Sequence, residues 1–203
     1  MDADLQSLTE HRIAGEELLR GRFLHAFRDT VRLPDGSSST REYVVHPGAV
    51  MIIPWLEGPD GVPQVVLERQ FRYPVGRVMI EFPAGKRDPG EDSLACAQRE
   101  LIEETGYRAS EWAFAGVLHP VISYSTEVID IWFARGLQPG PRRLDEGEFL
   151  EVFRAPATDL IAWCRDGQVT DAKTLTGAFW LQNVLNGLWT LDWRRVAPSA
   201  GAG

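Results

Sequence analysis

Short apolar runs separated by turn residues recur along the chain, and they predict a series of β-strands. The longest run, AVMIIPWL at 49–56, predicts a buried strand. A GPDG turn at 58–61 follows it, and the segment at 62–72 is expected to be the return strand. The other segments with strand character lie at 113–120, 125–137 and 149–156, and the segment at 78–85 leads into the first expected helix. The central part of the chain should therefore form a sheet of several strands.

Three further segments have a helical pattern. The clearest runs from Leu94 to Thr105 and contains good helix formers with no Gly or Pro. Asp92 or Ser93 can cap its start, and Gly106 can end it. Its inward face is expected to carry Leu94, Ala97 and Leu101. The other two helices are expected at 157–167 and 174–189, the second of them capped by the Asp-Ala-Lys-Thr element at 171–174. A mixed sheet between helices is an α+β fold.

The beginning of the chain has a less regular pattern. Residues 16–33 carry mixed signals, because Gly21 interrupts any helix while part of the segment alternates like a strand. The PDG turn at 34–36 then predicts a hairpin with strands near 22–33 and 40–46. We therefore expect an N-terminal β-hairpin subdomain in addition to the sheet and helices.

The chain is expected to consist of three segments. The N-terminal hairpin subdomain covers residues 1–47, and the main domain covers 48–196. The final segment, APSAGAG at 197–203, is expected to be a disordered tail, because small residues and Pro cannot bury an apolar core.

Composition and charge limit the possible partners. The chain has 203 residues, 44% of them hydrophobic, which suffices for one well-cored domain with an added N-terminal piece. A net charge of −8 without any Lys/Arg run argues against a nucleic-acid-binding surface. Cys96 and Cys164 are too few for a disulfide framework or a cysteine zinc site. No signal peptide or membrane-spanning run is visible, so we expect a cytoplasmic protein without a membrane partner.

One stretch carries the chemistry. Residues 85–107 read GKRDPGEDSLACAQRELIEETGY, and they place Glu100, Glu103 and Glu104 on the expected helix. Residues three and four apart are neighbours on a helix, so these carboxylates fall within an arc of about 100°. Clustered carboxylates repel one another unless a cation lies among them, and oxygen ligands suit Mg²⁺ or Mn²⁺. The alternative is an acidic helix face that is only solvated.

The same stretch resembles the Nudix box, the signature of hydrolases that act on nucleoside diphosphates linked to another moiety. Gly85, Glu91, Arg99 and Gly106 occupy fixed positions of the box, as do the three glutamates. The resemblance implies the α/β/α sandwich of that family with a mixed sheet, and a metal-dependent hydrolase.

The resemblance also implies roles for individual residues. Glu100 and Glu104 would bind the metal directly, with the backbone carbonyl of Ala84 as a further ligand. Glu103 would bind metal or order water, and Arg99, four residues earlier, can hold Glu103 by a charge-assisted bond. Glu91 would tie the loop of the box to its helix and take no part in the reaction.

Two segments after the box resemble the ADP-ribose pyrophosphatase branch of this family. In LHPVISYSTEVIDIWFA, Pro120 and Glu127 match a Pro-containing loop and a downstream Glu, although the usual Ser-Pro-Gly of the branch is replaced. In LDEGEFLEV, an acidic loop would supply Glu146 as the catalytic base and Glu148 as a metal-facing ligand. The base is left open among Glu146, Glu127 and Glu103.

Substrate-binding residues are expected before the box. Arg69 and Arg72 end a predicted strand, and either guanidinium could bind a phosphate in bidentate fashion, with the resemblance favouring Arg72. Glu81, in IEFPAG, matches a position near the nucleoside in the branch.

The resulting interpretation is a hydrolase that cleaves ADP-ribose to AMP and ribose 5-phosphate with Mg²⁺ or Mn²⁺. Another sugar nucleotide such as GDP-mannose, cleaved by the same chemistry, is the first alternative. A catalytically inactive domain that senses a nucleotide is the second, and the complete set of box carboxylates argues against it. A nucleotide-pool sanitiser or decapping enzyme is the third, and decapping calls for a basic RNA-binding surface that this acidic chain lacks.

A homodimer is the final expectation. The hairpin segment holds much apolar surface for two strands, namely Phe23, Leu24, Phe27, Val31, Tyr43, Val44 and Val45. An isolated hairpin is marginal in water, so this segment must pack on its own domain or on a neighbour. The resemblance implies exchange of this region across a two-fold axis, with the partner's segment completing the nucleoside subsites.

Overall fold

The computed structural model describes residues 5–144 and 146–196. Contacts between backbone positions divide the chain into two compact units. The N-terminal unit contains residues up to Gly48 together with Val121–Val128, and the main unit contains Ala49–Pro120 and the residues from Ile129 onward. The tail predicted at 197–203 lies outside the described residues.

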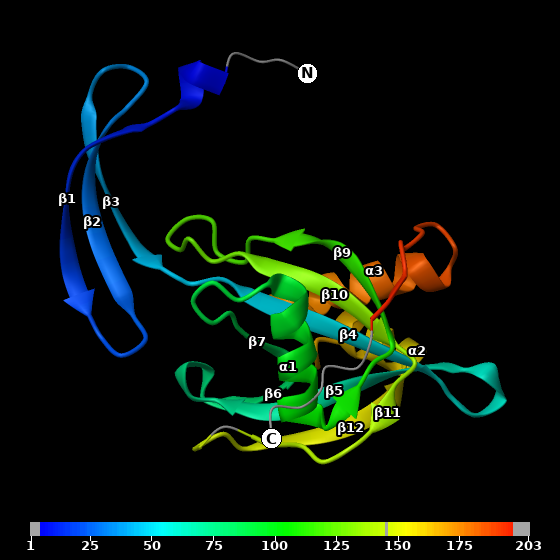
Figure 1. Cartoon of the computed structure of the whole chain (residues 1–203). Coiled ribbons are helices and arrows are strands. Elements are labelled where there is room, and N and C mark those ends of the chain that lie inside the picture. The colour runs from blue at the N-terminus through cyan, green and yellow to red at the C-terminus, as the bar shows by residue number, and fades with distance from the viewer. Residues whose placement is uncertain (1–4, 145, 197–203) are drawn as a thin grey trace. The chain divides into compact units, whose positions relative to one another are not determined.

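A three-stranded antiparallel sheet forms the N-terminal unit, in the order β1 (His11–Arg20), β2 (His25–Arg32), β3 (Ser38–Val45) (Figure 1). A 3-10 turn at Leu5–Leu8 precedes β1. The predicted hairpin is confirmed as β2 and β3, whereas β1 is a third strand that was not predicted. All residues of β1 are exposed, and its sequence, HRIAGEELLR, shows no alternation of apolar and polar residues that would reveal a strand. The segment 121–128 joins this unit through a parallel bridge between Val44 and Ser125.

The main unit is built on a mixed sheet whose strands follow the order β12-β5-β4-β10-β9-β13, with β6 paired to β5 and β7 paired to β4. Only the pairing of β4 with β10 is parallel in this sheet. The bounds are β4 (Ala49–Glu57), β5 (Pro63–Arg72), β6 (Arg77–Glu81), β7 (Ala84–Lys86), β9 (Glu111–Leu118), β10 (Ile129–Arg135), β12 (Leu150–Pro156) and β13 (Arg194–Arg195). A separate small pair joins β8 (Tyr107–Arg108) to β11 (Gln138–Pro139), and 3-10 turns lie at Pro59–Gly61 and Tyr73–Val75.

The predicted strands of the main domain correspond to β4, β5, β9, β10 and β12, whereas the short strands β8, β11 and β13 were not predicted. The segment at 78–85, which was expected to lead into the first helix, contributes to two short strands, β6 and β7, with Phe82 and Pro83 between them. Pro83 has no backbone N–H to donate, so a continuous ladder cannot run through this point. The break lets β6 pair with β5 and β7 pair with β4.

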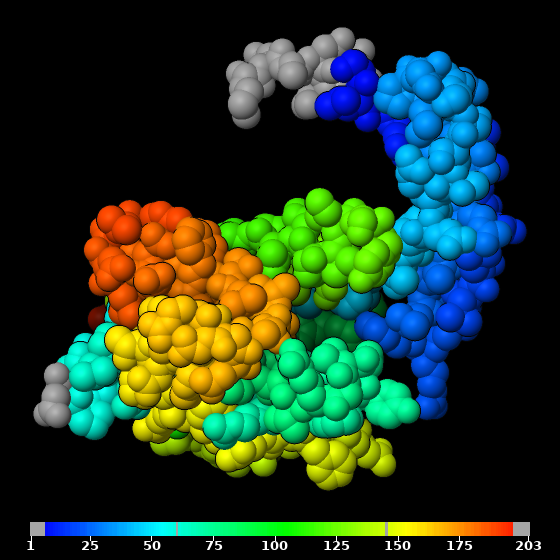
Figure 2. Space-filling view, turned by 180° about the vertical axis from the view of Figure 1, so that it is seen from behind, coloured from blue at the N-terminus to red at the C-terminus, as the bar shows by residue number. Residues whose placement is uncertain are grey.

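Three helices cover the sheet of the main unit: α1 (Ser93–Thr105), α2 (Ala157–Arg165) and α3 (Ala172–Leu185). All three confirm the predicted helices. The α1 side is in front of the sheet in Figure 1, whereas α2 and α3 form the opposite face seen in Figure 2. The α+β fold with a mixed sheet between helices is confirmed. Among the described residues, none of the helices could span a membrane.

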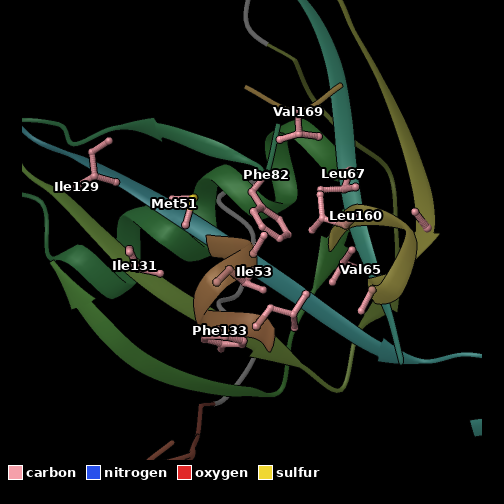
Figure 3. Packing of buried hydrophobic residues seen from close by; sticks show 14 of the residues in the cluster. Met51, Ile53, Val65, Leu67, Phe82, Ile129, Ile131, Phe133, Leu160 and Val169 are labelled. Atoms are coloured by element: carbon pink, nitrogen blue, oxygen red, sulfur yellow. The ribbon is translucent and has the colours of Figure 1, made fainter. Parts of the chain in front are cut away.

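The alternation of β4 divides the core between the two helix layers. Val50 and Ile52 belong to the cluster under α1, and Met51 and Ile53 belong to the cluster under α2 and α3. Figure 3 shows this second cluster, in which Phe82 lies among side chains from several strands. Successive side chains of a strand point to opposite faces, so a run of apolar residues in β4 fits a strand covered on both sides.

The ends of the helices carry the expected caps. Asp92 caps α1 by accepting hydrogen bonds from the backbone N–H groups of Leu94 and Ala95, at 2.9 and 3.2 Å. Gly106 ends the helix in the left-handed region with φ of 75°. Asp171 caps α3 by accepting from the backbone N–H of Thr174 at 2.9 Å. The caps at Asp92 and Gly106 fix where α1 begins and ends, and with this the positions of its glutamates along the helix.

Candidate active site

Glu100 lies directly over the backbone of Gly85. A Cβ atom built at position 85 would be 1.9 Å from the carboxyl carbon of Glu100, so no larger residue fits there without displacing the carboxylate. Burial raises the pKa of Glu100 to about 7, although Arg99 lies beside it. The absence of a side chain at Gly85, the first residue of the box, thus leaves the space that the Glu100 carboxylate occupies.

Arg99 connects the loop of the box to its helix. It donates two hydrogen bonds of 2.9 Å to Glu91, one of 2.8 Å to Glu100 and one of 3.0 Å to Glu103. Glu91 also accepts from the backbone N–H of Asp88 at 3.0 Å. The hydrogen bonds to Arg99 lower the pKa of Glu91 to about 2. The expected bond from Arg99 to Glu103 and the expected tie through Glu91 are both confirmed.

Glu104 is the most deeply buried carboxylate of α1, with 4% of its surface exposed. It accepts a hydrogen bond of 3.0 Å from the backbone N–H of Ala84, which places Ala84 beside it. Burial, followed by the charges of Glu68, Glu100 and Glu148, raises the pKa of Glu104 well above its usual value. The same causes would make a cation favourable at this point.

The acidic loop before β12 brings a carboxylate from outside the box. The Gln70 amide donates to Glu148 at 3.3 Å, and the charge of Glu148 contributes, after burial and nearer charges, to the raised pKa of Glu100 and Glu104. Glu146 lies on an exposed turn of this loop. No hydrogen bond or ion pair within the described part of the chain joins Glu146 to the box, so its role as base stays a prediction.

A second ion cluster is centred on Glu81, which is 2% exposed. Arg72 donates to it in bidentate fashion at 2.7 and 2.8 Å, and Lys173 also forms an ion pair with it. Lys173 in turn contacts Asp171 at 3.0 Å, and the hydroxyl of Thr174 accepts from the backbone N–H of Phe82 at 3.1 Å. The capping element of α3 is therefore also the element that fixes Glu81 and, through it, Arg72.

Arg69 points to the other face of β5. Its guanidinium forms an ion pair with Glu151 at 3.2 Å and lies 3.9 Å from the ring centroid of Phe153. Since Arg69 and Arg72 are an odd number of positions apart on one strand, their side chains face opposite sides of the sheet. The placement favours Arg72 as the phosphate-binding arginine.

Glu127 belongs to the N-terminal unit, whereas the box belongs to the main unit. Within its unit, the Glu127 carboxylate lies 3.8 Å from Nε2 of His46. The backbone N–H of His46 also donates to the hydroxyl of Thr126 at 2.9 Å. These contacts hold Glu127 on the N-terminal unit, and its catalytic role stays a prediction.

Comparison with known proteins decides the family of this chain. A family model described as the NUDIX domain matches residues 45–176, which is more than half of the chain. The chain belongs to the Nudix family. A second family model, the nucleoside diphosphate sugar hydrolase N-terminal domain, matches residues 10–44. The resemblance inferred from residues 85–107 is confirmed, and with it the interpretation as a hydrolase of pyrophosphate bonds.

Individual relatives of this Nudix hydrolase span almost all of it. An ADP-ribose pyrophosphatase of Bacillus subtilis is 34% identical over 180 residues, covering 88% of this chain and 95% of its own length. A methanol dehydrogenase activator of Bacillus methanolicus is 33% identical over 177 residues, covering 85% and 92%. A crystal structure of an ADP compounds hydrolase superposes with a TM-score of 0.78 at 26% identity, covering 89% and 96%.

The carboxylates of this Nudix site fit a divalent cation. Both carboxylate oxygens of Glu68 are buried without a hydrogen-bond partner in the described residues, and Glu104 lies close enough to feel its charge. Residues 5–144 and 146–196 contain no group of three His, Cys, Asp or Glu side chains arranged so that it could hold a metal ion by itself. The donor set is all oxygen, as Mg²⁺ and Mn²⁺ prefer.

Two residues near these carboxylates do not follow from the sequence pattern. The sequence predicts only a capping role for the element that contains Lys173, and it predicts no role for Glu68. Glu68 stands inside the predicted return strand, where strand alternation places it on the same face as Gln70 and Arg72. A charged residue within the apolar part of a buried strand was the signal that could have identified it.

Proposed function

We propose that this Nudix hydrolase cleaves the pyrophosphate of a nucleoside diphosphate sugar, and that its substrate is ADP-ribose, which it converts to AMP and ribose 5-phosphate. One observation carries the proposal: Glu100, Glu104 and Glu148 are buried or half-buried carboxylates, and their negative charges repel one another. The names of the Bacillus subtilis relative and of the superposed structure support an adenosine diphosphate substrate. The name of the Bacillus methanolicus relative describes an effect on another enzyme and no substrate.

Magnesium or manganese is the proposed cofactor. Glu100, Glu104, Glu148 and the carbonyl of Ala84 would hold the ion, and Glu103 would bind it or order water. When bound, the ion neutralises the diphosphate oxygens and makes water easier to deprotonate. Arg99 fixes the orientation of Glu100 and Glu103 by its hydrogen bonds.

Arg72 is the proposed ligand of a substrate phosphate. Its bidentate pair with Glu81 uses Nε and Nη2, so the Nη1 amino group remains to donate to a phosphate oxygen. Lys173 neutralises Glu81 further, which keeps the local charge around Arg72 favourable for an anion. In this proposal Glu81 is a positioning residue that acts through Arg72.

Glu146 is the proposed base that removes the proton of the attacking water, with Glu127 and Glu103 as alternatives. Its exposed turn contains Gly147, whose φ of 84° is in the region that favours glycine. A loop of this kind can move towards a bound substrate. Glu146→Gln should lower kcat by roughly 10²–10⁴-fold with little change in KM. A larger loss in Glu127→Gln would assign the base to the N-terminal unit.

A turnover assay tests the proposed function. The protein is freed of metal with a chelator, supplied with Mg²⁺ or Mn²⁺, and given ADP-ribose or GDP-mannose while the release of AMP or GMP is followed. We expect AMP from ADP-ribose only when metal is present. Preferred release of GMP would transfer the assignment to the GDP-mannose alternative. Tight binding of ADP-ribose without any turnover would instead support a sensing domain.

A homodimer is part of the proposal. β1 exposes Ile13, Leu18 and Leu19 by 44–49%, which is much apolar surface for a small sheet. We propose that a second copy covers it and that the N-terminal segment of the partner completes the nucleoside subsites. Light scattering that finds a fully active 22.7 kDa monomer would refute this.

A cytoplasmic location stays a prediction, which cell fractionation checks.

A further inference from the structure

Glu68 is a fully buried carboxylate that the described part of the chain leaves without a hydrogen bond. It lies in β5 with 0% of its surface exposed, and neither carboxylate oxygen has a partner. Burying an ionised carboxylate is very unfavourable unless it is paired or bound to a cation. Because burial of Glu68 is unfavourable for the fold, we looked for a role that its position beside the active site could give it.

The strand geometry directs Glu68 to the site. Glu68, Gln70 and Arg72 alternate with their neighbours on β5 and therefore share one face. Gln70 reaches Glu148 and Arg72 reaches Glu81 from that face. Glu68 thus stands on the same face as the two residues that contact the acidic loop and the second ion cluster.

The charges around Glu68 are mostly negative. It is the direct cross-strand partner of Glu81, and like charges at such positions destabilise a sheet. Burial, followed by the charge of Glu81, raises the pKa of Glu68, with Glu148 adding to the effect. The charge of Glu68 in turn has the largest effect, after burial, in raising the pKa of Glu104.

The nearby cations are already engaged elsewhere. Arg72 and Lys173 lower the pKa of Glu68 through space, but their hydrogen bonds go to Glu81 and, for Lys173, also to Asp171. Glu81 is therefore satisfied by protein groups, whereas Glu68 is not.

We propose that Glu68 is a further carboxylate of the metal centre and faces the divalent cation together with Glu104 and Glu148. The inference rests on the proposed metal-dependent function. It extends the set of metal-facing residues from α1 and the acidic loop to the central strand β5. A cation between Glu68 and Glu104 would offset the charge of both groups at once.

The competing explanation is charge balance within the second ion cluster. Glu68 and Glu81 would then offset Arg72 and Lys173, and Glu68 would act on substrate binding through Arg72. The two explanations differ in what the removal of the Glu68 charge does to metal affinity.

Titration of the metal-free protein with Mn²⁺, followed by calorimetry and by electron paramagnetic resonance of free Mn²⁺, tests the proposal. Glu68→Gln should bind Mn²⁺ at least about 10-fold more weakly than the wild type or lose one equivalent, the range expected when a metal-site group is removed. Glu57→Gln removes one exposed carboxylate at the far end of β4 and should bind as the wild type does. Unchanged Mn²⁺ affinity in Glu68→Gln with a raised KM would overturn the proposal and support charge balance.

Two further variants keep the result interpretable. Glu104→Gln reports on the metal centre itself: if this variant also binds Mn²⁺ normally, the proposed metal-dependent function fails, and not only the role of Glu68. If Glu68→Gln does not fold, Glu68→Asp retains the charge on a shorter side chain. It should fold and bind Mn²⁺ more weakly, and wild-type affinity in Glu68→Asp would overturn the proposal.

Discussion

Glu81 and Glu104 are the same residue type at similar depth, 2% and 4% exposed, yet their pKa values move in opposite directions. Burial is the largest influence on both and would raise each pKa. At Glu81 the hydrogen bonds and charges of Arg72 and Lys173 outweigh burial, so its pKa is lowered. At Glu104 the neighbouring charges are carboxylates, so its pKa is raised.

The cations that offset the charge of Glu81 belong to the protein, whereas a cation that offsets the carboxylates around Glu104 would have to be bound from solution. The cluster of Glu81 has its cations in the chain, and it serves to hold Arg72 in place. The cluster of Glu104 has backbone and carboxylate neighbours, and its stability depends on what binds there. Removing a carboxylate should therefore harm the first cluster and relieve the second.

The largest effect on stability is expected for Glu81→Gln. Loss of the Glu81 charge leaves Lys173 and Arg72 without their partner, and breaking a buried pair in this way costs about 3 kcal/mol of unfolding free energy. Chemical denaturation of the metal-free variant measures it. A loss below about 1 kcal/mol, typical of an exposed pair, would mean that the cluster is not structural.

Glu104→Gln should behave in the opposite way. We expect kcat to fall by at least roughly 10²-fold, about 2.7 kcal/mol of barrier, because charge stabilisation in the site is lost. The metal-free variant should unfold at the same temperature as the wild type or a higher one, because a repelled carboxylate has been removed. Turnover assays in saturating Mg²⁺ together with calorimetry check both parts. Near-normal turnover would exclude Glu104 as a metal ligand.

A smaller effect is expected from pH. Glu100 has a folded pKa of about 7 against an ordinary value of 4.5, so its protonated form favours the fold. That contribution is complete below the ordinary value and is lost as pH rises through about 7. The Tm of the metal-free protein should therefore fall by a few degrees across this window. Calorimetry of Glu100→Gln should give a shallower slope, and an equal slope would assign the titration to another group.

The smallest effect is expected for Arg69→Gln. Its partner Glu151 is exposed, and surface ion pairs contribute about 0–1 kcal/mol to stability. We expect KM for the substrate to change less than about 2-fold, whereas Arg72→Gln should raise it by at least about 10-fold through a lost charge-assisted contact. Steady-state kinetics of the two variants decide between the arginines.

Much of the site could be predicted because its elements are local. The helix of the box, its cap at Asp92 and its stop at Gly106 follow from residues within a few positions of one another. The bond from Arg99 to Glu103 follows from a spacing of four on a helix. The family follows from the same short stretch, which fixes seven residue identities.

Other parts required contacts between distant segments. The third strand of the N-terminal sheet was missed because β1 has no buried face, and only its pairing with β2 makes it a strand. Lys173 and Glu81 are 92 positions apart, and their ion pair depends on how the start of α3 meets the end of β6.

The fold class, the family and the carboxylates of α1 follow from the residues of the chain alone, because caps, helical spacing and glycines act over short distances. Which buried carboxylates of the strands are paired with cations follows from the three-dimensional arrangement. That outcome depends on strand register: Glu68 lies opposite Glu81 on one face of the sheet, yet Arg72 and Lys173 form hydrogen bonds with Glu81 and not with Glu68. Ion pairs between distant segments depend on distances in space, which a local pattern of residues does not contain.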